Sequence, residues 1–203
     1  MKLRGLYAIT PEIADRRRLR ELVGQALDGG VAALQYRCKS LPSSQRLEEA
    51  TALAALCRAK GARFIVNDDP GIAIAADADG AHLGRDDGDI PEARGRLAGK
   101  ILGVSCYDSI ERARSAVAAG ADYVAFGSVF SSPTKPAAVR APLALLAQAK
   151  PLGVPLVAIG GITLENAPQL IAAGADAVAV ISDLFDAPDV RDRARAYGKL
   201  FRS

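Results

Sequence analysis

The segment VAALQYRCKS changes from an apolar run to an alternation in which Gln35, Arg37 and Lys39 occupy every second position. Successive side chains of a strand point to opposite faces. The pattern therefore predicts that the amide and both cations lie on one face, with Tyr36 and Cys38 packed on the other. Charges on a half-buried strand are costly unless something compensates them, and a bound anion would do so. Two converging cations favour a site for a phosphate or diphosphate.

Aspartates follow two later apolar runs, in the segments VNDDP and HLGRDDGD. We expect Asp68 and Asp87 to be ligands for Mg²⁺, which commonly takes one or two carboxylates together with phosphate oxygens and water. Their neighbours Asp69 and Asp86 are more typical of helix caps and turns. A further cation, Lys135, lies in the long segment FGSVFSSPTKPAAVRAP and would join the anion site. Cations, carboxylates and a metal together favour a diphosphate leaving group.

A second phosphate site is predicted from the segments AIGGITLEN and ISDLF. Gly160 and Gly161 would let the backbone approach a ligand, and Thr163 is expected to open a helix whose first amides are unpaired. The amides around Ile181 and Ser182 would bind in the same way. A tight turn is the alternative interpretation of the two glycines.

Eight short apolar runs would position these residues, and they are GLYAIT, GGVAALQ, GARFIV, GAHLG, GKILGV, GADYVAFG, GVPLVAIG and GADAVAVI. A glycine precedes seven of them. Most of these glycines follow Ala- and Leu-rich segments of helical periodicity, so they fit helix ends with positive φ. The seven glycines are Gly30, Gly61, Gly80, Gly99, Gly120, Gly153 and Gly174.

The near-continuous apolarity of the runs predicts strands covered on both faces, as in a parallel sheet wrapped by helices. Eight helix-and-strand units in 203 residues predict an α/β fold with one domain, a (β/α)8 TIM barrel over residues 1–203. An open doubly wound sheet is the alternative, but no GxGxxG motif follows the first run. Active sites of such barrels lie at the C-terminal ends of the strands, where nearly all of the unusual polar residues fall.

Composition argues against several classes of function. The formal net charge is +3 and no basic stripe is interleaved with aromatic residues, so nucleic-acid binding is not expected. Three widely spaced cysteines without a CxxC pair, and no signal-peptide pattern, predict a cytoplasmic protein. No apolar run reaches the ~18 residues of a membrane span. The single histidine, His82, disfavours a zinc site and is expected to be a hydrogen-bonded core residue.

The ordered set of motifs resembles the thiamine-phosphate synthases and their relatives, the thiazole tautomerases. The resemblance covers almost the whole chain, from LYAIT through LQYRCK, VNDD, HLGRDD, GVS, GSVFSSPTK and AIGGIT to AVIS. It implies a (β/α)8 barrel that joins hydroxymethylpyrimidine diphosphate to hydroxyethylthiazole phosphate and releases pyrophosphate. The implied chemistry is dissociative, since the aminopyrimidine supports a carbocation that the thiazole nitrogen then captures. Small molecules are the expected partners, and a homo-oligomer is left open.

The resemblance also implies roles for individual residues. Contacts to the pyrimidine diphosphate are implied for Gln35, Arg37, Lys39, Asn67 and Lys135. The implied Mg²⁺ ligands are Asp68 and Asp87, and Ser105 would lie beside the reacting groups. A cradle for the thiazole phosphate is implied for Ser132, Thr134, Gly161, Ile181 and Ser182. Catalysis would then depend most directly on Arg37, Ser105 and Lys135.

Several positions depart from the family pattern. Tyr36 stands where many members have leucine, and Arg85 places an extra cation beside a proposed metal ligand. Ser128 stands where many members have proline, and Ser132 replaces a threonine. The tautomerase uses a histidine just past the fifth strand, where this chain has Tyr107, so the synthase is favoured.

A phosphate-binding protein without catalytic activity is the remaining alternative. Such a protein would be expected to have lost Lys135, Asp68 or Asp87, and all three are present.

Overall fold

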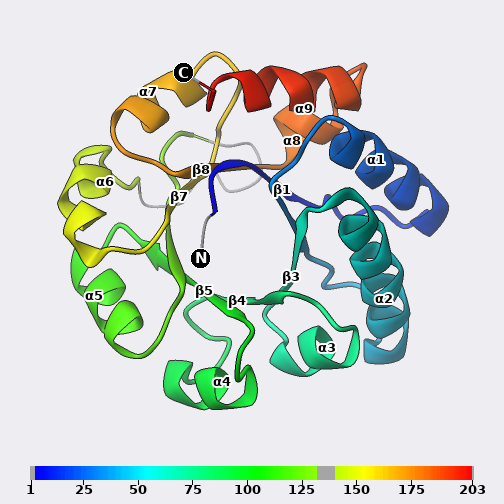
Figure 1. Cartoon of the computed structure of the whole chain (residues 1–203), viewed down its shortest axis with the longest axis horizontal. Helices are drawn as coiled ribbons and strands as arrows, with labels where there is room; N and C mark the ends of the chain where they lie inside the picture. Colours follow the sequence, from blue (N-terminus) through cyan, green and yellow to red (C-terminus); the bar gives the residue numbers. More distant parts are fainter. Residues whose placement is uncertain (1–2, 132–139, 203) are drawn as a thin grey trace.

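The computed structural model describes residues 3–131 and 140–202. Eight parallel strands close into a barrel in which each strand pairs with its neighbours in the chain and β8 pairs with β1 (Figure 1). The strands are β1 (Gly5–Ile9), β2 (Ala33–Tyr36), β3 (Arg63–Asn67), β4 (Gly80–Leu83), β5 (Ile101–Tyr107), β6 (Tyr123–Phe126), β7 (Leu156–Ile159) and β8 (Ala177–Val180). All eight predicted strands and the predicted barrel are confirmed.

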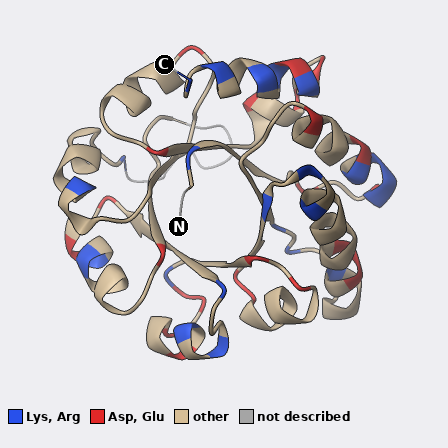
Figure 2. Cartoon of the chain, in the orientation of Figure 1, with Lys and Arg blue, Asp and Glu red and all other residues tan. Residues whose placement is uncertain are grey.

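Helices surround the ring of strands (Figure 1). They are α1 (Arg16–Asp28), α2 (Ser43–Lys60), α3 (Pro70–Ala75), α4 (Ile90–Arg96), α5 (Ile110–Ala118), α6 (Ala144–Ala149), the 3-10 helix η1 (Lys150–Leu152), α7 (Ala167–Ala172), α8 (Ser182–Phe185) and α9 (Val190–Lys199). Charged residues lie mainly on these helices and on the loops, while the strands are mostly free of them (Figure 2). Every helix in the described ranges is too short or too polar to cross a bilayer.

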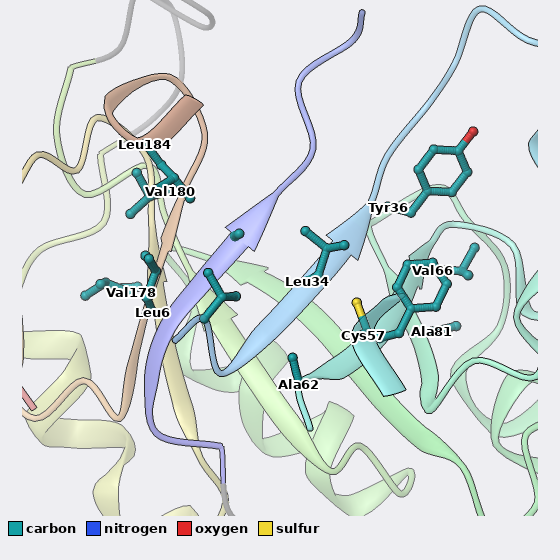
Figure 3. Close-up of a cluster of buried hydrophobic side chains, with 14 of the residues drawn as sticks. Leu6, Leu34, Tyr36, Cys57, Ala62, Val66, Ala81, Val178, Val180 and Leu184 are labelled. Atoms are coloured by element: carbon teal, nitrogen blue, oxygen red, sulfur yellow. The ribbon is translucent and has the colours of Figure 1, made fainter. Parts of the chain in front are cut away.

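Two hydrophobic cores stabilise the barrel. The larger one fills the space between the strands and the helices, and Figure 3 shows Leu34 and Tyr36 of β2 among its side chains. The smaller core lies inside the barrel, where it includes Tyr7, Ile65 and Tyr123. Successive side chains of a strand point to opposite faces. Neighbouring residues therefore pack alternately in the inner core and in the outer core.

Six of the seven glycines predicted at helix ends have positive φ, but Gly80 does not. Gly80 is instead the first residue of β4, and Asp77, with φ of 52°, takes the left-handed conformation that follows α3. A Cβ atom on Gly80 would lie 2.0 Å from the carbonyl oxygen of Ile101, so glycine is required there for close strand packing. The predicted helix end with positive φ is therefore wrong for Gly80, which is needed for close strand packing instead.

Gly103 of β5 provides a test of the inner core, because a Cβ atom there would lie 2.0 Å from the ring of the fully buried Tyr123. We expect Gly103→Ala to lower the free energy of unfolding by about 1–3 kcal/mol, because the ring must move within a closed barrel. The matched control is Gly24→Ala in α1, where no atom lies within 4 Å and alanine favours the helix. Urea denaturation of both variants measures the difference, and equal stabilities would contradict the packing argument.

Candidate active site at the barrel mouth

Gln35 and the two cations lie at the C-terminal end of the barrel. β2 ends at Tyr36, so Gln35 belongs to the strand while Arg37 and Lys39 lie just beyond it. Gln35 is buried inside the barrel, and its amide nitrogen donates to the Tyr7 hydroxyl at 3.0 Å. The cations belong to the following loop and are partly or largely exposed. Tyr36 and Cys38 pack against the outer core, as predicted, and both cations lie near Asp68 at the mouth. A shared face for Gln35, Arg37 and Lys39 stays a prediction.

Carboxylates partner both cations at the mouth. Glu12 lies 3.7 Å from Arg37, and Asp68 lies 3.8 Å from Lys39. Glu12 also accepts the backbone N–H groups of Lys39 and Ser40, and these bonds lower the pKa of its carboxyl group. Both ion pairs are longer than hydrogen bonds and reach solvent, so they restrain the cations only weakly.

Asp68 and Asp87 come together from the loops after β3 and β4, as predicted. Burial, and then the hydrogen bond and negative charge of Asp87, raise the pKa of Asp68 to about 6, although Lys39 and Arg37 oppose the shift. Asp68 has φ of 65°, and Asp87 accepts the backbone N–H of Gly84 at 2.7 Å. Two adjacent carboxylates with partial burial form a donor set that a divalent cation would satisfy. The described residues contain no cluster of three or more metal-binding side chains.

The two neighbouring aspartates have the positions predicted for caps and turns. Asp69 accepts the N–H of Ile72 at 2.9 Å and caps α3. Asp86 is exposed in the turn before α4. Only one aspartate of each pair therefore lies at the shared carboxylate site.

Ser105 lies in β5 at the rim of the inner core and is hydrogen-bonded to His82, whose Nε2 is 2.8 Å from the serine Oγ. The other ring nitrogen, Nδ1, lies 2.9 Å from the Tyr123 hydroxyl. Burial lowers the pKa of His82 to about 4. The prediction of a hydrogen-bonded core histidine is confirmed, and Tyr7 and Tyr123 emerge as polar groups that the sequence analysis had not singled out.

Arg112 of α5 ties the loop after β4 to the end of β5. Its Nε donates to the carbonyl of Ser105 at 2.7 Å, and one terminal nitrogen donates to the carbonyl of Gly84 at 3.1 Å. The guanidinium of Arg85 stacks 4.6 Å above the ring of Tyr107, and the Arg85 N–H donates to the Tyr107 hydroxyl. The extra cation of this chain is therefore held against an aromatic ring.

The predicted helix start at Thr163 was wrong. α7 begins at Ala167, and the Thr163 N–H is already paired with the side-chain oxygen of Asn166 at 2.9 Å. Gly160 and Gly161 have φ of 103° and 61°, and a Cβ atom on Gly161 would lie 2.2 Å from the carbonyl oxygen of Ser131. The glycines thus permit close packing of the loop after β6, and their contact with a phosphate stays a prediction.

The remaining predicted site residues have the following positions. Asn67 is the last residue of β3, and Ser182 is the first residue of α8, with Ile181 at its N-cap. The side chain of Asn67 is partly exposed at the mouth. Three predicted residues lie outside the described ranges, namely Ser132, Thr134 and Lys135.

A cavity of about 530 Å³ lies at the opposite end of the barrel, beside the starts of β3, β4 and β5. Its charged lining is already paired, with Arg58 2.7 Å from Asp77 and Arg63 2.8 Å from Asp79. The C-terminal ends of the strands lie at the end of the barrel away from this cavity. In barrel enzymes the active site is formed by the loops at the C-terminal ends of the strands. We therefore assign the candidate active site to the mouth.

The family described as Thiamine monophosphate synthase matches residues 6–184. The chain belongs to the thiamine monophosphate synthase family. The thiamine-phosphate synthase of Aromatoleum aromaticum is 58% identical over 202 residues, which cover 98% of this chain and 97% of that protein. The thiamine-phosphate synthase of Thiobacillus denitrificans is 58% identical over 199 residues, which cover 97% and 94%.

A solved structure supports the same assignment. The thiamine phosphate pyrophosphorylase from Pyrococcus furiosus is 38% identical and superposes with a TM-score of 0.87, covering 98% of this chain and 96% of that one. Membership of the thiamine monophosphate synthase family confirms the resemblance found in the motifs. It makes the chain an enzyme, a transferase of thiamine biosynthesis.

Lys39→Ala tests whether the mouth cations serve the ligand more than the fold. Because the Lys39–Asp68 pair is long and exposed, its loss should cost at most about 1 kcal/mol of stability. If Lys39 binds the leaving group, formation of thiamine phosphate should fall by about 10²-fold, because a positive charge that stabilises that group would be lost. The matched control is Lys60→Ala, which removes an exposed pair with Asp28 on the outer helices. A large fall in melting temperature with normal turnover would contradict this assignment.

Proposed function

We propose that the barrel mouth joins hydroxymethylpyrimidine diphosphate to hydroxyethylthiazole phosphate, which gives thiamine phosphate and pyrophosphate. The observation that carries this proposal is the meeting of opposite charges at the strand ends. Arg37 and Lys39 lie beside the adjacent carboxylates of Asp68 and Asp87. Cations alone would suit any anion, whereas cations next to a carboxylate pair suit a diphosphate that arrives with a divalent metal.

Arg37 and Lys39 would bind the diphosphate by exchanging their present partners for phosphate oxygens. The exchange is inexpensive because both ion pairs are long and solvated. Thr10 fixes the backbone of Arg37, since its hydroxyl accepts the Arg37 N–H at 2.9 Å. The loop that carries the cations is thus held while their side chains remain free to turn toward the ligand.

Asp68 and Asp87 would hold Mg²⁺. The fit rests on two adjacent, partly buried carboxyl groups. Burial first, and then the hydrogen bond and negative charge of Asp87, raise the pKa of Asp68, and a bound cation would relieve the repulsion between the two groups. When bound, Mg²⁺ supplies positive charge that stabilises the charge on the departing diphosphate. Asp87 is kept in place by the N–H of Gly84, whose carbonyl is in turn bound by Arg112.

Gln35, Asn67 and Ser105 would orient the pyrimidine above the inner core. The reaction that we propose is dissociative, so these side chains would position the pyrimidine ring and would not act as nucleophiles. Holding the two substrates together adds a proximity effect that reaches about 7–11 kcal/mol in favourable cases. Electrostatic stabilisation of the leaving group adds to this effect.

The thiazole phosphate would lie against the ends of β7 and β8, near Gly161, Ile181 and Ser182. We extend this site to the residues of the loop after β6 that lie outside the described ranges, which are Ser132, Thr134 and Lys135. Lys135 would be a third cation for the reaction. The cytoplasm is the location that we propose for the enzyme, and assembly into a homo-oligomer remains a prediction.

The tautomerase activity is less well supported. Tyr107 stands where that reaction would need a histidine, and its hydroxyl and ring are engaged with Arg85. His82, the single histidine of the chain, lies below the mouth with hydrogen bonds at both ring nitrogens.

Asp87→Asn tests the proposed function through its metal requirement. The purified wild-type protein should form thiamine phosphate from both substrates only when Mg²⁺ is present. The variant should require more Mg²⁺ and lose about 10²-fold or more in turnover, because one anionic ligand is lost. It should keep its fold, since the asparagine oxygen can still accept the Gly84 N–H. The product is measured by chromatography across a Mg²⁺ titration.

The matched control for this experiment is Asp86→Asn, which removes the neighbouring exposed carboxylate. We expect it to retain the wild-type Mg²⁺ dependence. If Asp87→Asn behaves like the control, Asp87 is a turn residue, and if the wild type forms no product, the proposed function is wrong.

A further inference from the structure

Five polar side chains form one hydrogen-bonded chain across the interior of the barrel. In order along the chain they are Gln35, Tyr7, Tyr123, His82 and Ser105, contributed by β2, β1, β6, β4 and β5. The successive distances are 3.0 Å, 2.7 Å, 2.9 Å and 2.8 Å. The two ends of the chain are residues proposed above to contact the pyrimidine. The three residues between them have had no role so far.

The middle of the chain is sealed from water. Tyr7 and Tyr123 are 1% and 0% exposed, and the rings of His82 and Tyr123 stack with their centroids 5.5 Å apart. Burial raises the pKa of both tyrosines, so each hydroxyl keeps its single proton. Each buried hydroxyl has one proton to donate, so if it accepts a hydrogen bond from one neighbour it must donate to the next. The donor-to-acceptor direction is therefore the same along the whole chain.

The direction follows from the amide of Gln35, whose nitrogen donates to the Tyr7 hydroxyl. Tyr7 has then accepted one bond and gives its own proton to Tyr123, and Tyr123 gives its proton to Nδ1 of His82. A neutral histidine that accepts at Nδ1 carries its proton on Nε2, which donates to Ser105. The hydroxyl proton of Ser105 and the side-chain oxygen of Gln35 are therefore left for a ligand.

We propose that Tyr7, Tyr123 and His82 are positioning residues that fix Gln35 as a hydrogen-bond acceptor and Ser105 as a hydrogen-bond donor toward the substrate. The inference rests on the proposed function only in that Gln35 and Ser105 contact the pyrimidine. An aminopyrimidine has the complementary pair, an amino group that donates and a ring nitrogen that accepts. The chain thus assigns the amino group to Gln35 and the ring nitrogen to Ser105, and it disfavours a pyrimidine with an oxo group in place of the amino group.

The first experiment reads the tautomer of His82 directly. The protein has one histidine, so a ¹⁵N-labelled sample gives a single set of imidazole resonances that need no assignment. We expect the long-range ¹H–¹⁵N spectrum of the wild type at neutral pH to show a protonated Nε2 and an unprotonated Nδ1. A proton on Nδ1 would reverse or break the chain and would overturn the proposal. This result does not depend on activity or on any variant.

The second experiment removes the central hydroxyl with Tyr123→Phe. The histidine should lose its single tautomer, and kcat/KM for the pyrimidine diphosphate should fall about tenfold, the equivalent of one hydrogen bond. The KM for the thiazole phosphate should stay unchanged, because Tyr123 supports only the groups that contact the pyrimidine. Unchanged kcat/KM for the pyrimidine diphosphate, or an unchanged tautomer, would overturn the positioning role.

Tyr36→Phe is the matched control. Tyr36 lies beside Gln35 in β2 but packs in the outer core, so its hydroxyl takes no part in the interior chain. This variant should keep the wild-type tautomer and both kinetic constants. If the wild type shows the expected tautomer but forms no thiamine phosphate, the proposed function fails and the hydrogen-bonded chain stands. If activity is normal and the tautomer is wrong, the chain fails and the function stands.

Discussion

The need to pair polar groups inside a closed barrel is the constraint on which the site depends. A closed sheet leaves its interior without water, so each buried amide, hydroxyl and imidazole must find a partner on another strand. Gln35 donates to Tyr7, and Tyr7 and His82 are both hydrogen-bonded to Tyr123, so these groups meet the requirement together. The backbone N–H of Asp68 also donates to the carbonyl of His82. The strand that contributes His82 to the interior hydrogen bonds therefore also holds the backbone of Asp68 at the mouth.

The mouth differs from the interior, because its charged groups are only weakly paired. Arg37 and Lys39 have carboxylate partners at 3.7 Å and 3.8 Å, and the two aspartates beside them repel each other. Cations in firm, desolvated ion pairs would resist an incoming diphosphate, because breaking such a pair is costly. A hydrogen-bonded interior lies beneath these loosely paired charges. The mouth is therefore held in position while its cations remain free to bind a ligand.

The sequence predicted those features that depend on local pattern and on barrel closure. Asp68 and Asp87 could be paired in advance because β3 and β4 are neighbours whose ends must meet. Tyr7 and Tyr123 could not be recognised, because a tyrosine inside an apolar run has the same pattern whether its hydroxyl is bonded or only packed. Glu12 lies outside every predicted motif, and its two backbone contacts depend on a loop of another unit. The Thr163 error arose because turn residues and a helix start share the same composition.

Binding of pyrophosphate, measured by calorimetry with and without Mg²⁺, tests the central claim that this mouth receives a diphosphate through metal and cations together. The account predicts one site per chain, with affinity that requires Mg²⁺, falls as salt is added and drops sharply in Arg37→Ala. Binding that is equally strong without Mg²⁺, or that is unchanged in Arg37→Ala, would contradict it.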